Sequence, residues 1–436
     1  MKGNKPRRII TLEAVFVYLA LFCISTYALL EHVSLSIPMF SQVKMPLLIM
    51  GGVCLVTKFG LFANNLLRRK YFFVFLTVCA LCVILAWSMY VNRNPEIGVS
   101  PIRNTVRLIL FLLEMFFLAM VIAETGRGKA TLNFLFWYLL VLLIINDIAL
   151  FTRVITFRIG KFEGFIVGNK FAVSYLHLDL LALWVARSRK TQKKRKYPFW
   201  LVLLIAVYMI AVAIRVDCMT GVLGSVAMVG LLVLADMASK QRRPWLTSHV
   251  TLLLALFVSV LFAFVVNLIV SIPVVSRLIE DVLGRDATLT GRTNIYAVYI
   301  SKLDGHWSAG YGFGNGNEVA DTLFGYPNAQ NALLQWVLQV GIYATGMLVF
   351  LMQQVFRHLH RKAERHTMEM VALVVLIYIY VMLGTVEISF NMTVIMWLML
   401  AYALVNERPR KQAVQPVKPM PKKRGRRVAL RLRQAQ

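Results

Sequence analysis

The sequence predicts an all-α protein that crosses a membrane many times, and three observations support this. Hydrophobic residues make up 59% of the 436 positions, and the mean hydropathy is +0.68. Apolar runs of about 18 residues or more recur along the chain, each long enough to cross a hydrocarbon core of about 30 Å. Short basic segments separate these runs. Because the bilayer core offers no water to free backbone groups, each run is expected to be helical.

The apolar runs predict about twelve transmembrane helices in one domain, residues 1–405. The first follows a basic start and lacks a cleavage site, which predicts an uncleaved span rather than a signal peptide. A long outer loop, about 272–327, separates the ninth helix from the tenth. The expected helices lie at about 9–30, 45–66, 71–91, 108–124, 131–151, 168–186, 199–214, 219–236, 248–271, 329–355, 369–386 and 390–405.

Basic residues mark every second boundary between the expected helices. They gather at residues 68–70, 127–129, 187–196, 240–243 and 357–366. This positive-inside pattern predicts that both termini lie in the cytoplasm. Topology and attraction to anionic lipid then explain the formal net charge of +28 without nucleic acid. Residues 406–436 are predicted to be a basic, disordered cytoplasmic tail.

The five cysteines show neither a disulfide framework nor the spacing of a zinc site. The expected outer loops carry no Asp-x-Asp pair. The sequence therefore predicts neither a metal nor a cofactor.

Arginine predominates over lysine in the segments expected outside. Positive-inside topology disfavours basic charge there, so the presence of these arginines requires an explanation. A guanidinium donates in pairs to phosphate oxygens, which indicates an anionic lipid-linked ligand such as a polyprenyl diphosphate. Pairing with outer acidic residues is the alternative for each of them. The arginines expected to bind this ligand are Arg153, Arg158, Arg215, Arg285 and Arg292.

Much of the outer chemistry is concentrated in residues 291–346. A glycine loop, with Gly312 and Gly314 at its centre, frees backbone amides to bind one anion, or is simply mobile. Trp307 and Tyr311 offer rings that stack on sugars or anchor the loop at the lipid boundary. This stretch is the expected substrate-binding segment.

Polar side chains also stand where expected helices begin or cross the membrane. Gln330 and Asn331 open the tenth helix, where their amides would orient a diphosphate or sugar hydroxyl, or cap the helix. Asp147, His177 and Asp179 stand at membrane depth in the fifth and sixth helices. Such groups relay protons or ions, or they hydrogen-bond between helices.

At these residues the sequence resembles the O-antigen ligase and O-antigen polymerase family of membrane glycosyltransferases. The shared pattern is a Gly-Arg before an amphipathic helix, a glycine loop, and an Asn-x-x-Leu that opens a span with two glycines further on. Here it is formed by Gly291-Arg292, the loop 310–316, Asn331, Leu334, Gln335, Gly341 and Gly346. Gly168-Asn169-Lys170 resembles the family's opening of the sixth span, and residues 217–221 resemble its Ser-Arg-Thr-Gly. Arg153 and Gly164 also reproduce an Arg-x10-Gly spacing of some polymerases.

The sequence departs from the family pattern at two positions, and the first departure favours a polymerase over a ligase. Gln330 replaces the histidine that in ligases assists the acceptor hydroxyl, and glutamine is not a base. Met219 replaces an arginine at the eighth span, although Arg215 stands one helical turn earlier.

The resemblance implies a glycosyltransferase-C-like fold and an inverting, metal-independent transfer. The donor would be an undecaprenyl-diphosphate-linked oligosaccharide and the acceptor another repeat unit. The resemblance implies that the transfer takes place at the outer face of the inner or plasma membrane of a bacterial cell, with a flippase and a chain-length regulator as partners. A ligase with a different acceptor, or a flippase or transporter of the same lipid, are the alternatives. Asp217, Asp304, His306 and Glu318 are unranked candidates for a general base, and a transfer without a base is the alternative. The implied catalytic residues are Arg292, Arg215 and Gln330; the implied substrate-binding residues are Arg285, Arg153, Arg158, Asn331, Gly312, Gly314, Trp307, Tyr311 and Asn169.

Overall fold

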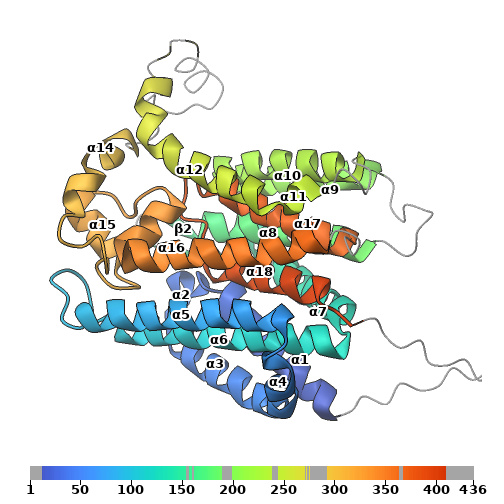
Figure 1. Cartoon of the computed structure of the whole chain (residues 1–436). Coiled ribbons are helices and arrows are strands. Elements are labelled where there is room, and N and C mark those ends of the chain that lie inside the picture. The colour runs from blue at the N-terminus through green and yellow to red at the C-terminus, as the bar shows by residue number, and fades with distance from the viewer. Residues whose placement is uncertain are drawn as a thin grey trace, which may run out of the picture.

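The computed structural model describes residues 12–153, 157–159, 162–188, 199–237, 244–270, 272, 274, 292–362 and 367–408. Over these residues the chain forms a bundle of long helices, with residues 292–330 gathered at one end (Figure 1). The basic tail is described only as far as Arg408, so the prediction of a disordered tail lies outside the described residues beyond that point.

The helices in the N-terminal half are α1 (Leu12–Leu29), α2 (Val33–Ser36), α3 (Phe40–Val56), α4 (Phe59–Leu66), α5 (Arg69–Val91), α6 (Ile102–Thr125), α7 (Gly128–Thr152), α8 (Lys170–Ser188) and α9 (Phe199–Arg215). Those in the C-terminal half are α10 (Met219–Met237), α11 (Pro244–Thr247), α12 (His249–Val270), α14 (Arg292–Lys302), α15 (Gly316–Phe324), α16 (Ala332–Arg361), α17 (Met368–Leu383) and α18 (Met392–Val405). A hairpin of β1 (Phe157–Ile159) and β2 (Phe162–Gly164) is antiparallel, with Arg158 opposite Glu163.

The helices make this a multi-pass membrane protein. Within the described residues seven helices are long and apolar enough to cross a membrane: α1, α5, α6, α7, α10, α12 and α16. The bent pair α3 and α4 would add an eighth, and α9, α17 and α18 are shorter apolar helices. An α-helix lies in each of the twelve expected runs, the sixth being α8. The count of twelve crossings itself stays a prediction.

The second expected span is not one continuous helix. The sequence predicts a helix at about 45–66, but the chain bends by 73° between α3 and α4. Lys58 stands at this bend and forms a salt bridge with Glu13 in the first turn of α1. A charged ammonium is costly in hydrocarbon unless it is paired or reaches the interface. The pairing of Lys58 therefore accounts for the end of the apolar helix at Val56.

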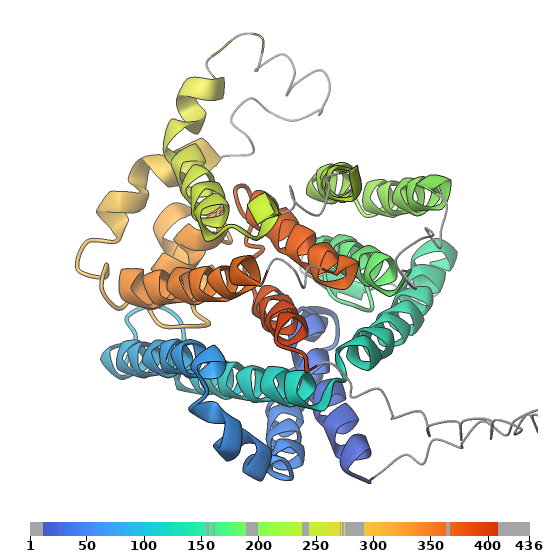
Figure 2. The ribbon, with the colours of Figure 1, turned by 45° about the vertical axis from the view of Figure 1, so that its right-hand side comes forward.

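α18 lies at the centre of the bundle. It contacts α1, α6, α16 and α17, and almost all its residues are buried (Figure 2). α17 is buried nearly as completely. A helix that is apolar on all sides belongs in such an interior position.

The basic boundaries of several spans meet at one end of the bundle. Glu124, at the end of α6, accepts a hydrogen bond from Lys70 at 2.5 Å and pairs with Arg408. The backbone N–H of Gly128 donates to Glu407 Oε1 at 2.9 Å. These residues come from three segments that the sequence assigns to the cytoplasm, and we call this the inner end.

Candidate functional site

The end of the bundle opposite Glu124 carries an ordered cap. Residues 292–330 form α14, α15 and their connections, and they lie at the left in Figure 1. The cap has its own hydrophobic core, in which Ile295, Tyr299 and Val319 pack with Leu338 of α16. The described part of the long outer loop is therefore a folded unit with fixed side chains.

The glycine loop of the cap pairs with a break in α16. Gly312 N–H donates to the Gln339 carbonyl at 2.8 Å, and Ile342 N–H donates to the Trp307 carbonyl at 2.8 Å. α16 is interrupted at Gly341, which has φ 77° and ψ 175°. A Cβ there would lie only 2.0 Å from a carbonyl oxygen of the loop. The two glycine segments of the family resemblance thus meet, backbone against backbone.

The amides of this loop are already used by the protein. Gly310 N–H donates to the His306 carbonyl at 2.8 Å, and Gly314 N–H donates to Gln339 Oε1 at 2.9 Å. Together with the Gly312 bond, these contacts leave no anion-binding role for the three amides. Close packing explains the glycines instead.

The packing seats the loop on the first turn of α6. A Cβ on Gly312 would lie 2.9 Å from Pro101, and a Cβ on Gly314 would lie 2.1 Å from Asn104 Nδ2. Side chains at either position would push the loop away from this turn. The loop therefore depends on α6 for its position.

Asn331 caps α16, and its side chain is fully engaged. The Oδ1 atom accepts from the N–H groups of Leu333 and Leu334 at 3.1 Å each. The Nδ2 group donates to the carbonyls of Ser259 at 3.0 Å and Thr385 at 3.2 Å. Of the two roles that the sequence left open, these contacts correspond to capping.

The other expected residues of the cap differ in how far they reach the surface. Gln330 is half-buried with φ 52°, and its carbonyl accepts from the Tyr296 hydroxyl at 2.7 Å. Trp307 remains 37% exposed, so its ring is free to meet a ligand. Tyr311 is buried, stacks on His306 at a centroid distance of 3.8 Å and donates to the Lys302 carbonyl. Burial, followed by the charge of nearby Glu96, raises the pKa of Tyr311.

A cluster of basic side chains lies beside this first turn of α6. Arg107 is only 6% exposed and donates to the Ser41 carbonyl at 2.9 Å, while Arg103 donates to the same oxygen at 3.4 Å. Lys44 donates to the Glu31 carbonyl at 2.7 Å. Within the described part of the chain, Arg107 Nε and Glu31 Oε2 are buried without a hydrogen-bond partner. We call Glu31, Lys44, Arg103 and Arg107 the α6 cluster.

Arg103 and Arg107 are not among the arginines that the sequence analysis selected as site residues. One signal was available, because residues four apart share a face of a helix. Their contact with the segment around Ser41 was not visible, since it joins positions 62 and 66 residues apart.

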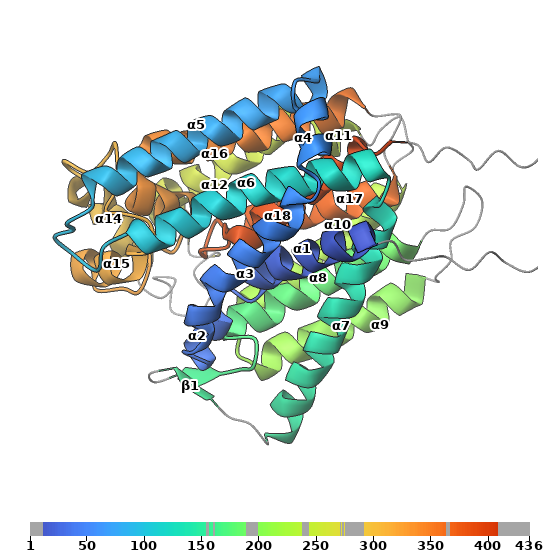
Figure 3. The same cartoon turned by 90° about the horizontal axis from the view of Figure 1, so that it is seen from below.

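A second basic group surrounds the start of α8. Arg153 and Arg215 line a small cavity of about 30 Å³ with Glu163, roughly the space of one water molecule. Lys170 donates to the Asp217 carbonyl at 2.9 Å. Asn169 caps α8 by accepting from the backbone of Ala172. The hairpin at this group lies beside α2, at lower left in Figure 3.

The remaining predicted arginines are described only in part. Arg292 is the first residue of α14, and Arg158 lies in β1, but their side chains lie outside the described set. Arg285 is outside the described residues altogether. The expectation that Arg292 and Arg215 share one pocket is therefore neither met nor contradicted.

A polar cluster lies between α7, α8 and α9 at membrane depth. His177 Nε2 lies 3.0 Å from Asp147 Oδ2, and the Tyr208 hydroxyl donates to the same oxygen at 2.5 Å. Asp179 is not part of this cluster and instead accepts from Trp397 Nε1 at 2.9 Å. Hydrogen bonding between helices, one of the two expected roles, is present.

The fold and its two polar ends define the class as a multi-pass helical membrane protein with a folded cap at the end of the bundle opposite Glu124. Within the described residues, no group of three or more His, Cys, Asp or Glu side chains is placed to hold a metal ion. No family model, curated protein or solved structure matches the chain.

Proposed function

We propose that the protein is a membrane glycosyltransferase. It polymerises undecaprenyl-diphosphate-linked oligosaccharide units into a surface polysaccharide at the outer face of the bacterial plasma membrane. The observation that carries this proposal is the seating of the glycine loop on the first turn of α6. The segment resembling the polymerase family thus packs on the same end of α6 that carries Arg103 and Arg107.

The α6 cluster would stabilise the leaving diphosphate. As the bond between the anomeric carbon and the carrier phosphate breaks, its electron pair leaves with the diphosphate. Preorganised cations in a site that excludes water are the most effective stabilisers of such charge. Arg107 is held by Ser41 and still has a free Nε donor, and the N-terminus of α6 adds a positive partial charge. In the same proposal Arg292 and Arg215 bind the carrier phosphates from other sides.

Glu31 is our candidate for the general base. The acceptor hydroxyl attacks the anomeric carbon and must lose its proton, which a carboxylate within hydrogen-bond reach accepts. Glu31 Oε2 has no partner among the described residues, whereas Asp217 is paired with Lys170 and His306 is stacked on Tyr311. Trp307 would then support a sugar ring of the acceptor or donor.

The test is a reconstitution of purified protein with synthetic undecaprenyl-diphosphate repeat units, scored for a ladder of products. Removing one preorganised donor costs about 10²–10³ in rate, so Arg107→Ala should lower polymer formation by about that factor. Arg107→Lys should also be impaired, since lysine lacks the paired donors. Lys302→Ala removes an exposed outer cation of the cap and should leave the ladder unchanged.

The outcomes separate the alternatives. A ladder of normal rate with Arg107→Ala would overturn the assigned role of the α6 cluster. A single transfer onto a foreign acceptor, without a ladder, would identify a ligase. No transfer by folded wild-type protein would overturn the proposed function.

A transporter of the same lipid is the second candidate. The Asp147–His177 pair favours it, because ionisable groups at membrane depth often carry protons in transporters. It predicts that His177→Ala abolishes movement of the lipid across the bilayer of vesicles. It also predicts that neither the wild type nor Arg107→Ala forms polymer.

A further inference from the structure

A carboxyl group is buried near the middle of α6, and the proposed transferase does not use it. Glu114 is only 9% exposed. It lies about two helical turns beyond Arg107, which corresponds to about 10 Å along the helix axis. Glu114 therefore stands in the interior of a helix that is long and apolar enough to cross the membrane, where ionisable groups are costly and often functional.

The carboxyl group faces a pair of glycines on α3. A Cβ added to Gly52 would lie 2.9 Å from Glu114 Oε1. A Cβ added to Gly51 would lie 3.2 Å from Glu114 Oε2 and 3.0 Å from Ile24 of α1. Small residues allow helices to approach closely in a membrane, and here the two glycines leave the room that the carboxyl group occupies. α1, α3 and α6 thus enclose Glu114 between them.

Glu114 has no counter-ion among the described residues. Its Oε2 atom is buried without a hydrogen-bond partner, and it forms none of the described salt bridges. The titratable groups near it on α1 are Cys23 and Tyr27. Cys54 of α3 lies close to Cys23, and Arg107 is the nearest basic residue along α6. Neither a thiol nor a phenol offers positive charge, so nothing close to the carboxyl group neutralises an ionised form.

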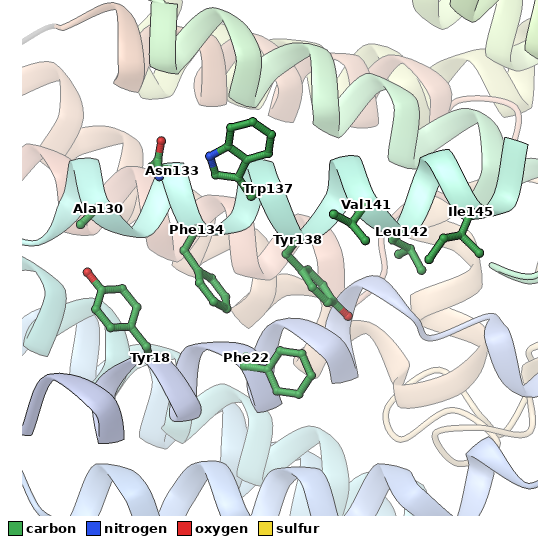
Figure 4. A pocket seen from close by; sticks show the side chains of 10 residues that line it. All are labelled: Tyr18, Phe22, Ala130, Asn133, Phe134, Trp137, Tyr138, Val141, Leu142 and Ile145. Atoms are coloured by element: carbon green, nitrogen blue, oxygen red, sulfur yellow. The ribbon is translucent and has the colours of Figure 1, made fainter. Parts of the chain in front are cut away.

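The apolar groove on the other side of α1 supplies no partner either. This groove lies between α1 and α7 and has a volume of about 710 Å³ (Figure 4). Phe22 of α1 lines it, whereas Ile24 meets Gly51 of α3. Residues two apart lie on nearly opposite faces of a helix. Glu114 and the groove are therefore separated by α1.

We propose that Glu114 is a proton-binding site enclosed by α1, α3 and α6, and that it carries a proton at neutral pH. An isolated carboxylate in apolar surroundings is very costly, and such a group becomes neutral instead. The bound proton is what allows the glycine face of α3 to close on α6. This inference does not depend on the proposed transferase.

The chemistry of the site favours a proton over a metal cation. Hard cations such as Ca²⁺ and Mg²⁺ need several oxygen ligands around them. Within the described residues no group of three or more His, Cys, Asp or Glu side chains is placed to provide them. A single carboxyl group against two glycines suffices for a proton.

The experiment is infrared spectroscopy of the purified full-length protein in lipid nanodiscs. A protonated carboxyl group absorbs through its C=O stretch at a frequency where a carboxylate does not. The wild type should show this band at neutral pH, and Glu114→Gln should lose part of it. Other protonated carboxyl groups cancel in the difference between the two spectra. In the wild type the same part of the band should disappear as the pH is raised. Glutamine has nearly the shape of a protonated glutamate, so this variant should fold.

Glu124→Gln is the matched control, because Glu124 is also a buried glutamate of α6 but is paired with Lys70 and Arg408. An ionised carboxylate contributes nothing to the band, so this variant should leave it unchanged. Glu13→Gln, which removes an exposed carboxylate paired with Lys58, serves the same purpose if Glu124→Gln does not fold. Identical bands in the wild type and Glu114→Gln would show that Glu114 is ionised and would overturn the proposal.

A lipid-soluble carbodiimide tests the enclosure of the carboxyl group by a second route. The reagent modifies a protonated carboxyl group, whose proton passes to a nitrogen of the reagent while a carboxyl oxygen bonds to its central carbon. Peptide mass spectrometry should find the adduct on Glu114 of the wild type. Gly52→Ala places a methyl group against Oε1 and should reduce this adduct, whereas Gly60→Ala, with nothing within 4 Å of the added Cβ, should not. An adduct on Glu124 in place of Glu114 would contradict the assignment.

Discussion

Two glycines of the same helix, Gly341 and Gly346, have different structural surroundings. Gly341 has a positive φ, and the cap loop approaches it so closely that a Cβ would meet a backbone oxygen. Gly346 is exposed in regular helix, with nothing within 4 Å of a Cβ added there. The sequence pattern treats the pair alike, because the spacing of glycines carries no information about what lies across from them.

The pair provides a test with an internal control. Gly341→Ala should destabilise the protein by about 1–3 kcal/mol from backbone strain alone, with the clash added. Gly346→Ala should be neutral or stabilise by up to about 1 kcal/mol, since alanine is the better residue in an exposed helix. The measurement is the temperature at which half of the detergent-solubilised protein remains monodisperse. Equal shifts for the two variants would show that the cap does not pack on the break in α16.

At the same scale, the arginines show the limit of reasoning from sequence. The excess of arginine in the segments expected outside can be seen in the sequence, and it indicated an anionic ligand. Which arginine is buried was not readable, because the burial of Arg107 depends on a carbonyl of Ser41 that approaches from another helix. Desolvation is a property of the assembled site, and no local pattern encodes it.

At the scale of the elements, the side chain that begins α16 has two separate structural roles. Asn331 uses its oxygen to cap its own helix and its amide group to join the residues before α18 and the middle of α12. Asn391 caps α18 through its oxygen, which accepts from the N–H of Thr393 at 3.1 Å. Asn331 differs in that its oxygen accepts a second N–H and its amide group donates to two carbonyls.

Replacement of each cap by aspartate separates these contributions. Aspartate caps a helix as well as asparagine does, so Asn391→Asp should change stability by less than about 0.5 kcal/mol. Asn331→Asp removes both donors and turns a buried carboxylate toward two carbonyl oxygens, which costs at least about 1–3 kcal/mol. Thermal denaturation in detergent measures both. A mild effect of Asn331→Asp would mean that the contacts to Ser259 and Thr385 contribute little.

The bend between α3 and α4 shows why element boundaries were harder to predict than element positions. Hydropathy averaged over a run of residues tolerates one lysine, so residues 45–66 were expected to form one helix. Lys58 finds its partner on α1, 45 residues away, and that distant contact decides where the apolar helix ends. The remaining runs needed no distant contact, because their hydrophobicity alone is enough to make them helical in a membrane.

On the scale of the whole molecule, charge divides the bundle into two unlike ends. Glu124 pairs with basic residues of two segments, 68–70 and the residues after α18, at the inner end. Arg103, Arg107 and Lys44 instead lie at the other end, where Arg107 Nε and Glu31 Oε2 have no hydrogen-bond partner among the described residues. The alternation of basic segments predicted which end of the bundle faces the cytoplasm, and this prediction depends only on the positions of Lys and Arg in the sequence. The arrangement of helices around α18 could not be predicted in the same way, since every span offers a similar apolar surface.

Labelling of single cysteines tests the predicted orientation. In a background with the five native cysteines replaced, Lys302→Cys should react with a membrane-impermeant maleimide in intact cells. Arg357→Cys should react only after the membrane is opened, because α16 separates the two exposed positions. The opposite pattern would reverse the assignment of outer and inner ends. Reaction of both in intact cells would show that α16 does not cross the membrane.

The central place of α18 has a consequence for how the protein is made. A ribosome releases helices into the bilayer in chain order, at about 5–20 residues per second, so α18 emerges after its neighbours α1, α6 and α16. These older helices cannot complete their packing until α18 joins them. Assembly therefore requires the entry of a later helix into the middle of older ones, and a nascent chain stopped before Met392 would lack the helix that they surround.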